Sequence, residues 1–65
     1  MKVTVNGDDR ELPDGASVTL LLQDLKLTPD KVAIELNRRL LRGDKYDQPL
    51  KEGDVIEVVT FVGGG

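Results

Sequence analysis

The chain is 65 residues long, carries 12 acidic and 9 basic side chains for a net charge of −3, and contains no cysteine and no histidine. This length allows one small domain, and the composition excludes a disulfide framework, a thiolate metal site and the commonest general base. The acidic balance also disfavours nucleic acid or an anionic membrane as the main partner, so we expect a domain that works with a larger protein.

The chain begins with a pattern typical of a β-hairpin. Valines alternate with polar residues over positions 2–6, which indicates a half-buried strand. Asn6 and Gly7 follow, and both residues tolerate the positive φ angles of a tight hairpin turn. A short second strand is predicted at about residues 10–12, before a break at residues 13–15.

A single amphipathic helix is predicted over about residues 18–26. Ser17 is suited to be its N-cap, because a serine hydroxyl can accept a hydrogen bond from a free backbone N–H group. The helix must end by Thr28, since Pro29 disfavours helical geometry in the residue before it. Its apolar face combines positions spaced i, i+3, i+4 and i+7, namely Val18, Leu21, Leu22 and Leu25.

Three further strands are predicted after the helix, over residues 32–36, 39–41 and 55–62. A tight turn at Asn37-Arg38 would join the first two of them. Because arginine is unfavourable at positive φ, we expect a turn type other than that of an Asn-Gly pair. The polar stretch before the last strand is predicted to be a loop.

The order strand, strand, helix, strand, short strand, strand predicts a two-layer α+β fold, because one amphipathic helix can cover only one face of a sheet. We find no repeat, linker or second domain in the pattern. The predicted core consists of the inward-facing apolar residues: Val3, Val5, Leu12, Val18, Leu21, Leu22, Leu25, Val32, Ile34, Leu36, Ile56 and Val58.

Three glycines close the sequence: Gly63, Gly64 and Gly65. A tail without side chains can enter a narrow channel and bring its backbone close to the active site of another protein. The carboxylate of Gly65 becomes reactive once it is joined to AMP, which supplies a good leaving group. We therefore predict that a partner enzyme acts on this carboxylate. The alternative is a frayed end without a function.

The last predicted strand is apolar on both of its faces. If Ile56 and Val58 face the helix, then Val55, Val59 and Phe61 lie on the open face beside the tail. An exposed apolar patch next to a reactive end is typical of an interface, so we predict that these three residues bind the partner. The alternative is that they fill a sheet edge or reflect β-strand propensity alone.

Two weaker patterns suggest other kinds of site. A basic cluster of Arg38, Arg39, Arg42 and Lys45 has the charge to contact phosphate or an acidic partner, although such runs are most often solvated. Acidic pairs in turns, such as Asp8-Asp9, lack the spacing of metal ligands, and we predict no metal site.

Three segments together resemble a known family: residues 32–37 (VAIELN), 49–59 (PLKEGDVIEVV) and 61–65 (FVGGG). They are similar to the ThiS family, the sulfur carrier proteins of thiamine (thiazole) biosynthesis, and the similarity extends over essentially the whole chain. The resemblance implies a ubiquitin-like β-grasp fold, with a mixed sheet of four to five strands, one main helix on one face, and the first and last strands parallel at the centre. It also implies a folded body over residues 1–62 and a flexible tail over residues 63–65.

The same resemblance implies that the chain is a carrier and not an enzyme. An E1-like adenylyltransferase would use ATP and Mg²⁺ to adenylate Gly65, and a sulfur donor such as a cysteine desulfurase would supply the sulfur of a thiocarboxylate. Gly63 and Gly64 would thread the tail into the partner's active site, and thiazole synthase would take up the sulfur. We also expect no bound cofactor, no nucleic-acid or membrane partner, a monomer when isolated and, without a recognisable signal peptide, a cytoplasmic location.

Other functions remain open on the same residues. The small subunit of molybdopterin synthase, or a related sulfur carrier, uses the same tail chemistry for a different acceptor. A ubiquitin-like protein modifier would instead be joined through Gly65 to a lysine. A β-grasp module that binds RNA through Arg38, Arg39 and Arg42 is disfavoured by the acidic net charge.

Overall fold

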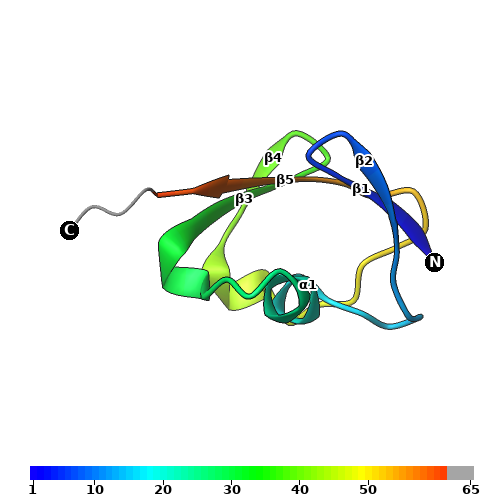
Figure 1. Cartoon of the computed structure of the whole chain (residues 1–65), viewed down its shortest axis with the longest axis horizontal. Coiled ribbons are helices and arrows are strands. Elements are labelled where there is room, and N and C mark those ends of the chain that lie inside the picture. Colours follow the sequence, from blue (N-terminus) through cyan, green and yellow to red (C-terminus); the bar gives the residue numbers. More distant parts are fainter. Residues whose placement is uncertain (62–65) are drawn as a thin grey trace.

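The computed structural model describes residues 1–61, which form one mixed sheet of five strands with one α-helix beneath it (Figure 1). The sheet order is β2-β1-β5-β3-β4; β1 and β5 are parallel, and the other neighbours are antiparallel. This confirms the predicted two-layer α+β architecture, including the parallel central strands. The elements are β1 (Lys2–Val5), β2 (Asp8–Glu11), α1 (Val18–Asp24), β3 (Val32–Leu36), β4 (Arg39–Leu41) and β5 (Val55–Thr60).

The first hairpin is tighter than predicted. Asn6 and Gly7 have φ angles of 49° and 87°, as a two-residue hairpin turn requires. Pairing therefore resumes at once, with Asp8 opposite Val5, and β2 is Asp8–Glu11 rather than residues 10–12. The acidic residues of β2 do not interrupt the strand, because it is an edge strand whose side chains reach solvent.

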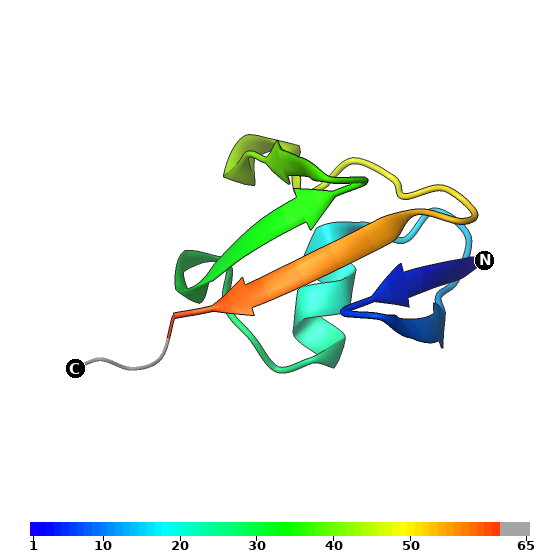
Figure 2. The same cartoon turned by 90° about the horizontal axis from the view of Figure 1, so that it is seen from above.

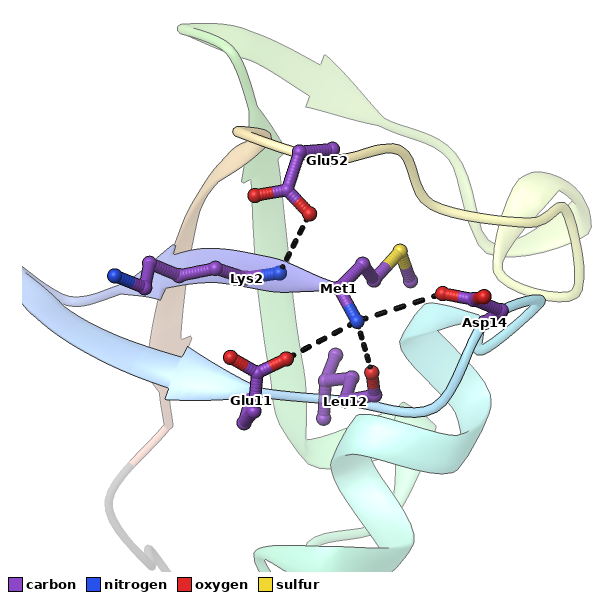
Figure 3. Close-up of polar contacts among 6 residues, drawn as sticks. All are labelled: Met1, Lys2, Glu11, Leu12, Asp14 and Glu52. Atoms are coloured by element: carbon purple, nitrogen blue, oxygen red, sulfur yellow. Dashed lines mark hydrogen bonds and ion pairs between the residues drawn. The ribbon is translucent and has the colours of Figure 1, made fainter.

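The start of β1 is held by charged and polar contacts (Figure 3). The amino group of Met1 donates a hydrogen bond to the Leu12 carbonyl oxygen at 2.6 Å and lies 3.1 Å from Glu11 Oε2. The hydrogen bond that this amino group donates to the Glu11 carboxylate raises the pKa of the amino group above its usual 8.0. The backbone N–H of Lys2 donates to Glu52 Oε1 at 2.9 Å, so β1 is tied both to the end of β2 and to the turn before β5.

Helix α1 begins as predicted and ends earlier than predicted. The Ser17 hydroxyl accepts a hydrogen bond from the Leu20 N–H at 3.3 Å, which confirms the N-cap. At the other end Lys26 adopts φ 60°, and the N–H of Leu27 bonds the Leu22 carbonyl at 2.9 Å. This Schellman closure ends the helix at Asp24 instead of residue 26.

The turn between β3 and β4 contradicts the prediction made for it. Asn37 and Arg38 have φ angles of 51° and 71°, so arginine does occupy the position that glycine would favour. The side chain of Asn37 accounts for this geometry, because its Nδ2 donates to Asp54 Oδ1 at 3.0 Å and its Oδ1 accepts from the Val55 N–H at 2.9 Å. These bonds secure the turn against the beginning of β5.

The core is nearly the predicted set. All of its predicted members are buried except Leu25 and Leu36, which lie half-buried at its margin because they stand at the ends of their elements. Ala16, Tyr46 and Leu50 are also buried and were not predicted. They come from irregular segments that carry no periodicity, and the Leu50 N–H reaches the Ala16 carbonyl at 2.7 Å.

Short 3-10 turns, which were not predicted, flank two of the strands. The first, Pro29–Lys31, leads into β3, and the second, Gly43–Lys45, lies in the predicted loop after β4. β5 ends at Thr60 rather than at residue 62, although the Phe61 N–H still bonds the Lys31 carbonyl at 3.0 Å. Within residues 1–61 no helix has the length and apolar character needed to span a membrane.

Candidate functional site

The two faces of β5 differ in exposure in the way that the sequence predicts. Ile56 and Val58, with 0% and 8% of their surface exposed, face α1 and belong to the core. Val55, Val59 and Phe61 are 40%, 53% and 60% exposed. We call these three residues the β5 strip. Because side chains alternate along a strand, these residues lie on the face opposite to that of Ile56 and Val58. β5 itself leads to the end of the described chain (Figures 1 and 2).

The backbone beneath the β5 strip is bonded on both sides. β3 pairs with β5 over five positions, whereas β1 pairs only through Thr4 with Val55 and Val5 with Ile56. Beyond that point the side chain of Asn6 replaces the missing strand. Its Oδ1 accepts from the Val58 N–H at 2.7 Å, and its Nδ2 donates to the Val58 carbonyl at 3.2 Å. The strip is therefore presented on a firmly held strand.

A further exposed apolar residue, Leu40, was missed by the sequence reasoning. It is 72% exposed and lies on β4 opposite Glu35, which in turn pairs with Glu57 of β5. Paired residues share a face, so Leu40 lies on the same open face as the β5 strip. The alternation along residues 39–41 contained this information, but the strand was too short for its outward face to be recognised.

The predicted reactive tail lies outside the described residues. Nothing in the geometry of residues 1–61 tests the role of Gly63, Gly64 and Gly65, or the boundary predicted between the body and the tail. The β5 strip is the part of the predicted site that the structure describes, and its role in binding a partner stays a prediction.

The other candidate groups are all at the surface. Arg38, Arg39, Arg42 and Lys45 are exposed, and Arg42 Nε lies 3.7 Å from Asp44 Oδ1. The other acid of that loop, Asp47, accepts a hydrogen bond from the Thr19 hydroxyl at 2.6 Å, a structural role. Among residues 1–61 no group of three or more acidic side chains is arranged to hold a metal ion.

Comparison with known proteins identifies the family. The model of the ThiS family matches residues 3–65. The chain belongs to the ThiS family. The resemblance found in the sequence is thus confirmed, and with it the expected kinship to the sulfur carriers of thiamine biosynthesis.

Individual members of the ThiS family match along their whole length. The sulfur carrier protein ThiS of Thermus thermophilus is 36% identical over 64 residues, which cover 97% of this chain and 98% of that protein. The crystal structure of the thiamine biosynthesis protein ThiS from Geobacter metallireducens superposes with a TM-score of 0.80 at 36% identity, over all of both chains. A ubiquitin-like protein from Caldiarchaeum subterraneum, 22% identical with a TM-score of 0.55, shares the fold. These matches confirm the β-grasp fold.

Two relatives are much longer than this chain. The thiazole synthases of Paramagnetospirillum magneticum and Magnetococcus marinus are 36% and 41% identical to it over 66 residues. The chain spans only 20% of the length of each of these proteins. A ThiS-like segment therefore occurs within a polypeptide named thiazole synthase.

Proposed function

We propose that the protein is a sulfur carrier of thiamine biosynthesis whose reactive atom is the carboxyl carbon of Gly65. The observation that carries this proposal is the membership of the ThiS family over residues 3–65, a match that includes the three closing glycines. The exposed β5 strip supports it, since a carrier needs an apolar surface by which an enzyme can hold it while the tail is processed. The relatives' names favour thiamine over molybdopterin biosynthesis.

The chemistry begins with activation of the tail. A carboxylate oxygen of Gly65 attacks the α-phosphorus of ATP, pyrophosphate leaves, and an acyl adenylate forms. The terminal sulfur of a persulfide, such as that of a cysteine desulfurase, then attacks the carbonyl carbon, and AMP leaves. A thiolate then attacks the donor's cysteine sulfur in the resulting S–S bond, a disulfide forms between these two sulfurs, and the thiocarboxylate of Gly65 leaves.

The catalytic groups for these steps belong to partner proteins in this proposal. The chain has no histidine and no cysteine, so it offers neither an imidazole base nor a thiolate for sulfur transfer. An E1-like adenylyltransferase supplies ATP, Mg²⁺ and the groups that stabilise the charge on the phosphates. Gly63 and Gly64 fit the narrow path to that site, because a residue without a side chain allows close approach on every side.

Thiazole synthase is the proposed acceptor of the sulfur. The support comes from the long relatives, in which a segment similar to this chain shares one polypeptide with the rest of a thiazole synthase. Two activities carried on one chain are held at a high effective concentration, which suits a donor and its acceptor.

The test is a conversion assay read by intact mass. The chain is incubated with ATP, Mg²⁺, cysteine, a cysteine desulfurase and the E1-like adenylyltransferase encoded in the same genome. We expect a mass increase equal to the replacement of one oxygen by sulfur, located at Gly65. The matched control lacks Gly64 and Gly65; it should keep the melting temperature of the full chain and gain no sulfur.

Three outcomes would contradict the proposal. If the full chain gains no sulfur while a ThiS protein known to be active with the same enzymes does, the carrier function is wrong. If trypsin digestion of a cell lysate yields lysines of other proteins that carry the peptide 52–65 of this chain, which follows its last basic residue, the chain is a protein modifier instead. Sulfur transfer to a molybdopterin synthase large subunit would assign the other pathway.

A further inference from the structure

The edge of the sheet formed by the β3–β4 turn and β4 concentrates positive charge in an acidic protein. Four of the nine basic side chains lie within residues 38–45, together with one acid, Asp44. We call Arg38, Arg39 and Arg42, with Leu40 between them, the basic edge. All four side chains are exposed, and Leu40 more so than Val55, Val59 or Phe61.

The charges of the basic edge are largely uncompensated. Among residues 1–61, neither Arg38 nor Arg39 lies within ion-pair distance of a carboxylate, and Arg42 has only the exposed contact of 3.7 Å with Asp44. Such an exposed pair contributes little, because water and salt screen it. The guanidinium groups are therefore free to take acidic partners without breaking a stable internal contact.

The backbone of Arg38 is also held in an unfavourable conformation. Its φ of 71° is a backbone geometry in which glycine would be less strained. The turn cannot swing away, because the Asn37 N–H bonds the Val55 carbonyl at 2.7 Å and the Asn37 side chain bonds Asp54 and Val55. Positive φ alone does not indicate function, since Lys26 has φ 60° only to close a helix. Arg38 differs from Lys26 in being joined by two further arginines and an exposed leucine.

We propose that the basic edge docks onto an acidic patch of a partner protein, with Leu40 entering an apolar recess between the partner's carboxylates. The proposal rests on the proposed carrier function, which requires such a partner. A protein surface fits better than a nucleic acid, because the exposed Leu40 side chain needs apolar cover, which a phosphate backbone does not provide.

The basic edge and the β5 strip would together fix the orientation of the carrier. The turn at Arg38 lies beside Val55 at the beginning of β5, and Phe61 follows the end of that strand. Six strand residues separate these points by about 20 Å at roughly 3.3 Å per residue. Leu40 lies on the same face as the β5 strip, whereas Arg39 pairs with Leu36 and lies at the edge on the other face. Contacts at Leu40 and at the far end of β5 would fix the direction in which the body approaches the partner's active site.

The test compares two variants of the full chain, each of which replaces a basic residue of positive φ by glycine. Arg38→Gly removes a guanidinium from the basic edge at φ 71°, and Lys26→Gly removes an ammonium from the helix side at φ 60°. Binding is measured by titration calorimetry against the purified adenylyltransferase and thiazole synthase of the same genome, at low and at high salt. Arg38→Lys and Leu40→Ser are measured in parallel.

We expect Arg38→Gly to weaken binding to at least one of the two enzymes by about two- to tenfold at low salt, with a smaller difference at high salt. Leu40→Ser should weaken it at both salt concentrations, and Arg38→Lys should recover part of the loss. Lys26→Gly should bind like the wild type. Both glycine variants should melt no lower than the wild type, so that a loss of affinity cannot come from unfolding.

Equal affinity of Arg38→Gly and the wild type at low salt, or an equal loss in Lys26→Gly, would overturn the proposal. Binding of the wild type to neither enzyme, or salt-dependent binding to an RNA oligonucleotide that Arg38→Gly abolishes, would overturn it as well. The carrier function is judged separately by the gain of sulfur at Gly65. If the chain gains sulfur at Gly65 and its affinity for both enzymes is the same with and without Arg38, the docking inference is refuted and the carrier function is not.

Discussion

The aliphatic residues on the two faces of β5 are chemically alike and differ in their exposure. Ile56 and Val58 on one face and Val55 and Val59 on the other are all β-branched, yet the first pair is almost fully buried and the second is about half exposed. Hydrophobicity alone does not distinguish them. The difference comes from α1, which covers only one side of the sheet (Figure 1).

This contrast predicts that stability and partner binding depend on different faces of the same strand. Burial against α1 removes apolar surface from water on folding, and that transfer stabilises the domain. The open face leaves its apolar surface in water, where it adds little to stability and remains available for a partner. A substitution on the buried face should therefore lower the free energy of unfolding. The same substitution on the open face should instead lower the affinity for a partner.

The largest expected effect compares neighbouring valines. Val58→Ala removes buried methyl groups beside α1, and we expect it to lower the free energy of unfolding by about 1.5–3 kcal/mol. Val59→Ala makes the same chemical change on the open face and should alter it by less than about 0.5 kcal/mol. Urea denaturation followed by circular dichroism measures both. Similar losses in the two variants would show that the open face is part of the stabilising core.

A smaller effect is expected at the side chain that holds β5 where β1 ends. Asn6→Gly keeps the positive φ of the turn but removes both hydrogen bonds to Val58. We expect a loss of about 1 kcal/mol, because the freed backbone groups can reach water. Amide hydrogen exchange should quicken most at Val58. Unchanged exchange at Val58 would mean that pairing with β3 alone holds this part of β5, and that the hydrogen bonds of Asn6 do not contribute.

The smallest effect is a pH dependence in the turn beside the end of β5. The Thr28 hydroxyl donates a hydrogen bond to Asp30 and lowers the pKa of that carboxyl below its usual 3.8. A lowered pKa in the folded state means that the carboxylate stabilises the fold above the usual pKa, and that this contribution is lost as the pH falls through the lowered one. The same turn supplies the Lys31 carbonyl that binds the Phe61 N–H.

Nuclear magnetic resonance titration checks this pH dependence. The pKa of Asp30 should rise toward its usual value in Thr28→Val and stay low in Thr28→Ser, which keeps the hydroxyl. An equal pKa in the wild type and Thr28→Val would show that the hydroxyl is not the cause. Since Asp30 is at the surface, the core face of β5 should not respond to this change, whereas the amide of Phe61 should.

Local patterns were sufficient for most of the fold and for part of the candidate site. The alternation of apolar residues along residues 55–59 predicts the two faces of β5, and the structure places Val55, Val59 and Phe61 on the exposed side as expected. The Asn6-Gly7 turn and the Ser17 cap also follow from their own chemistry, because each concerns atoms only a few residues apart.

The turn at Arg38 and the burial of Tyr46 and Leu50 were not predicted for the same physical reason, which is contact between segments that are distant in the sequence. Arg38 takes positive φ because Asn37 is bonded to Asp54 and Val55, residues that are distant in the sequence. Tyr46 and Leu50 are buried because their segment packs against the start of α1, where the Thr19 N–H reaches the Tyr46 carbonyl at 3.0 Å. Neither residue belongs to a periodic element, so no local pattern could indicate its burial.

The sequence by itself determined the helix and the order of the strands, the two faces of β5 and the family, since these depend on spacing along the chain. Only the tertiary structure decided which distant segments contact one another. Examples are the pairing of Val5 with Ile56, the hydrogen bonds between Asn6 and Val58, and the position of Leu40 opposite Glu35. Such contacts depend on the path of the backbone between segments that are far apart in the chain, and spacing within one segment carries no information about that path.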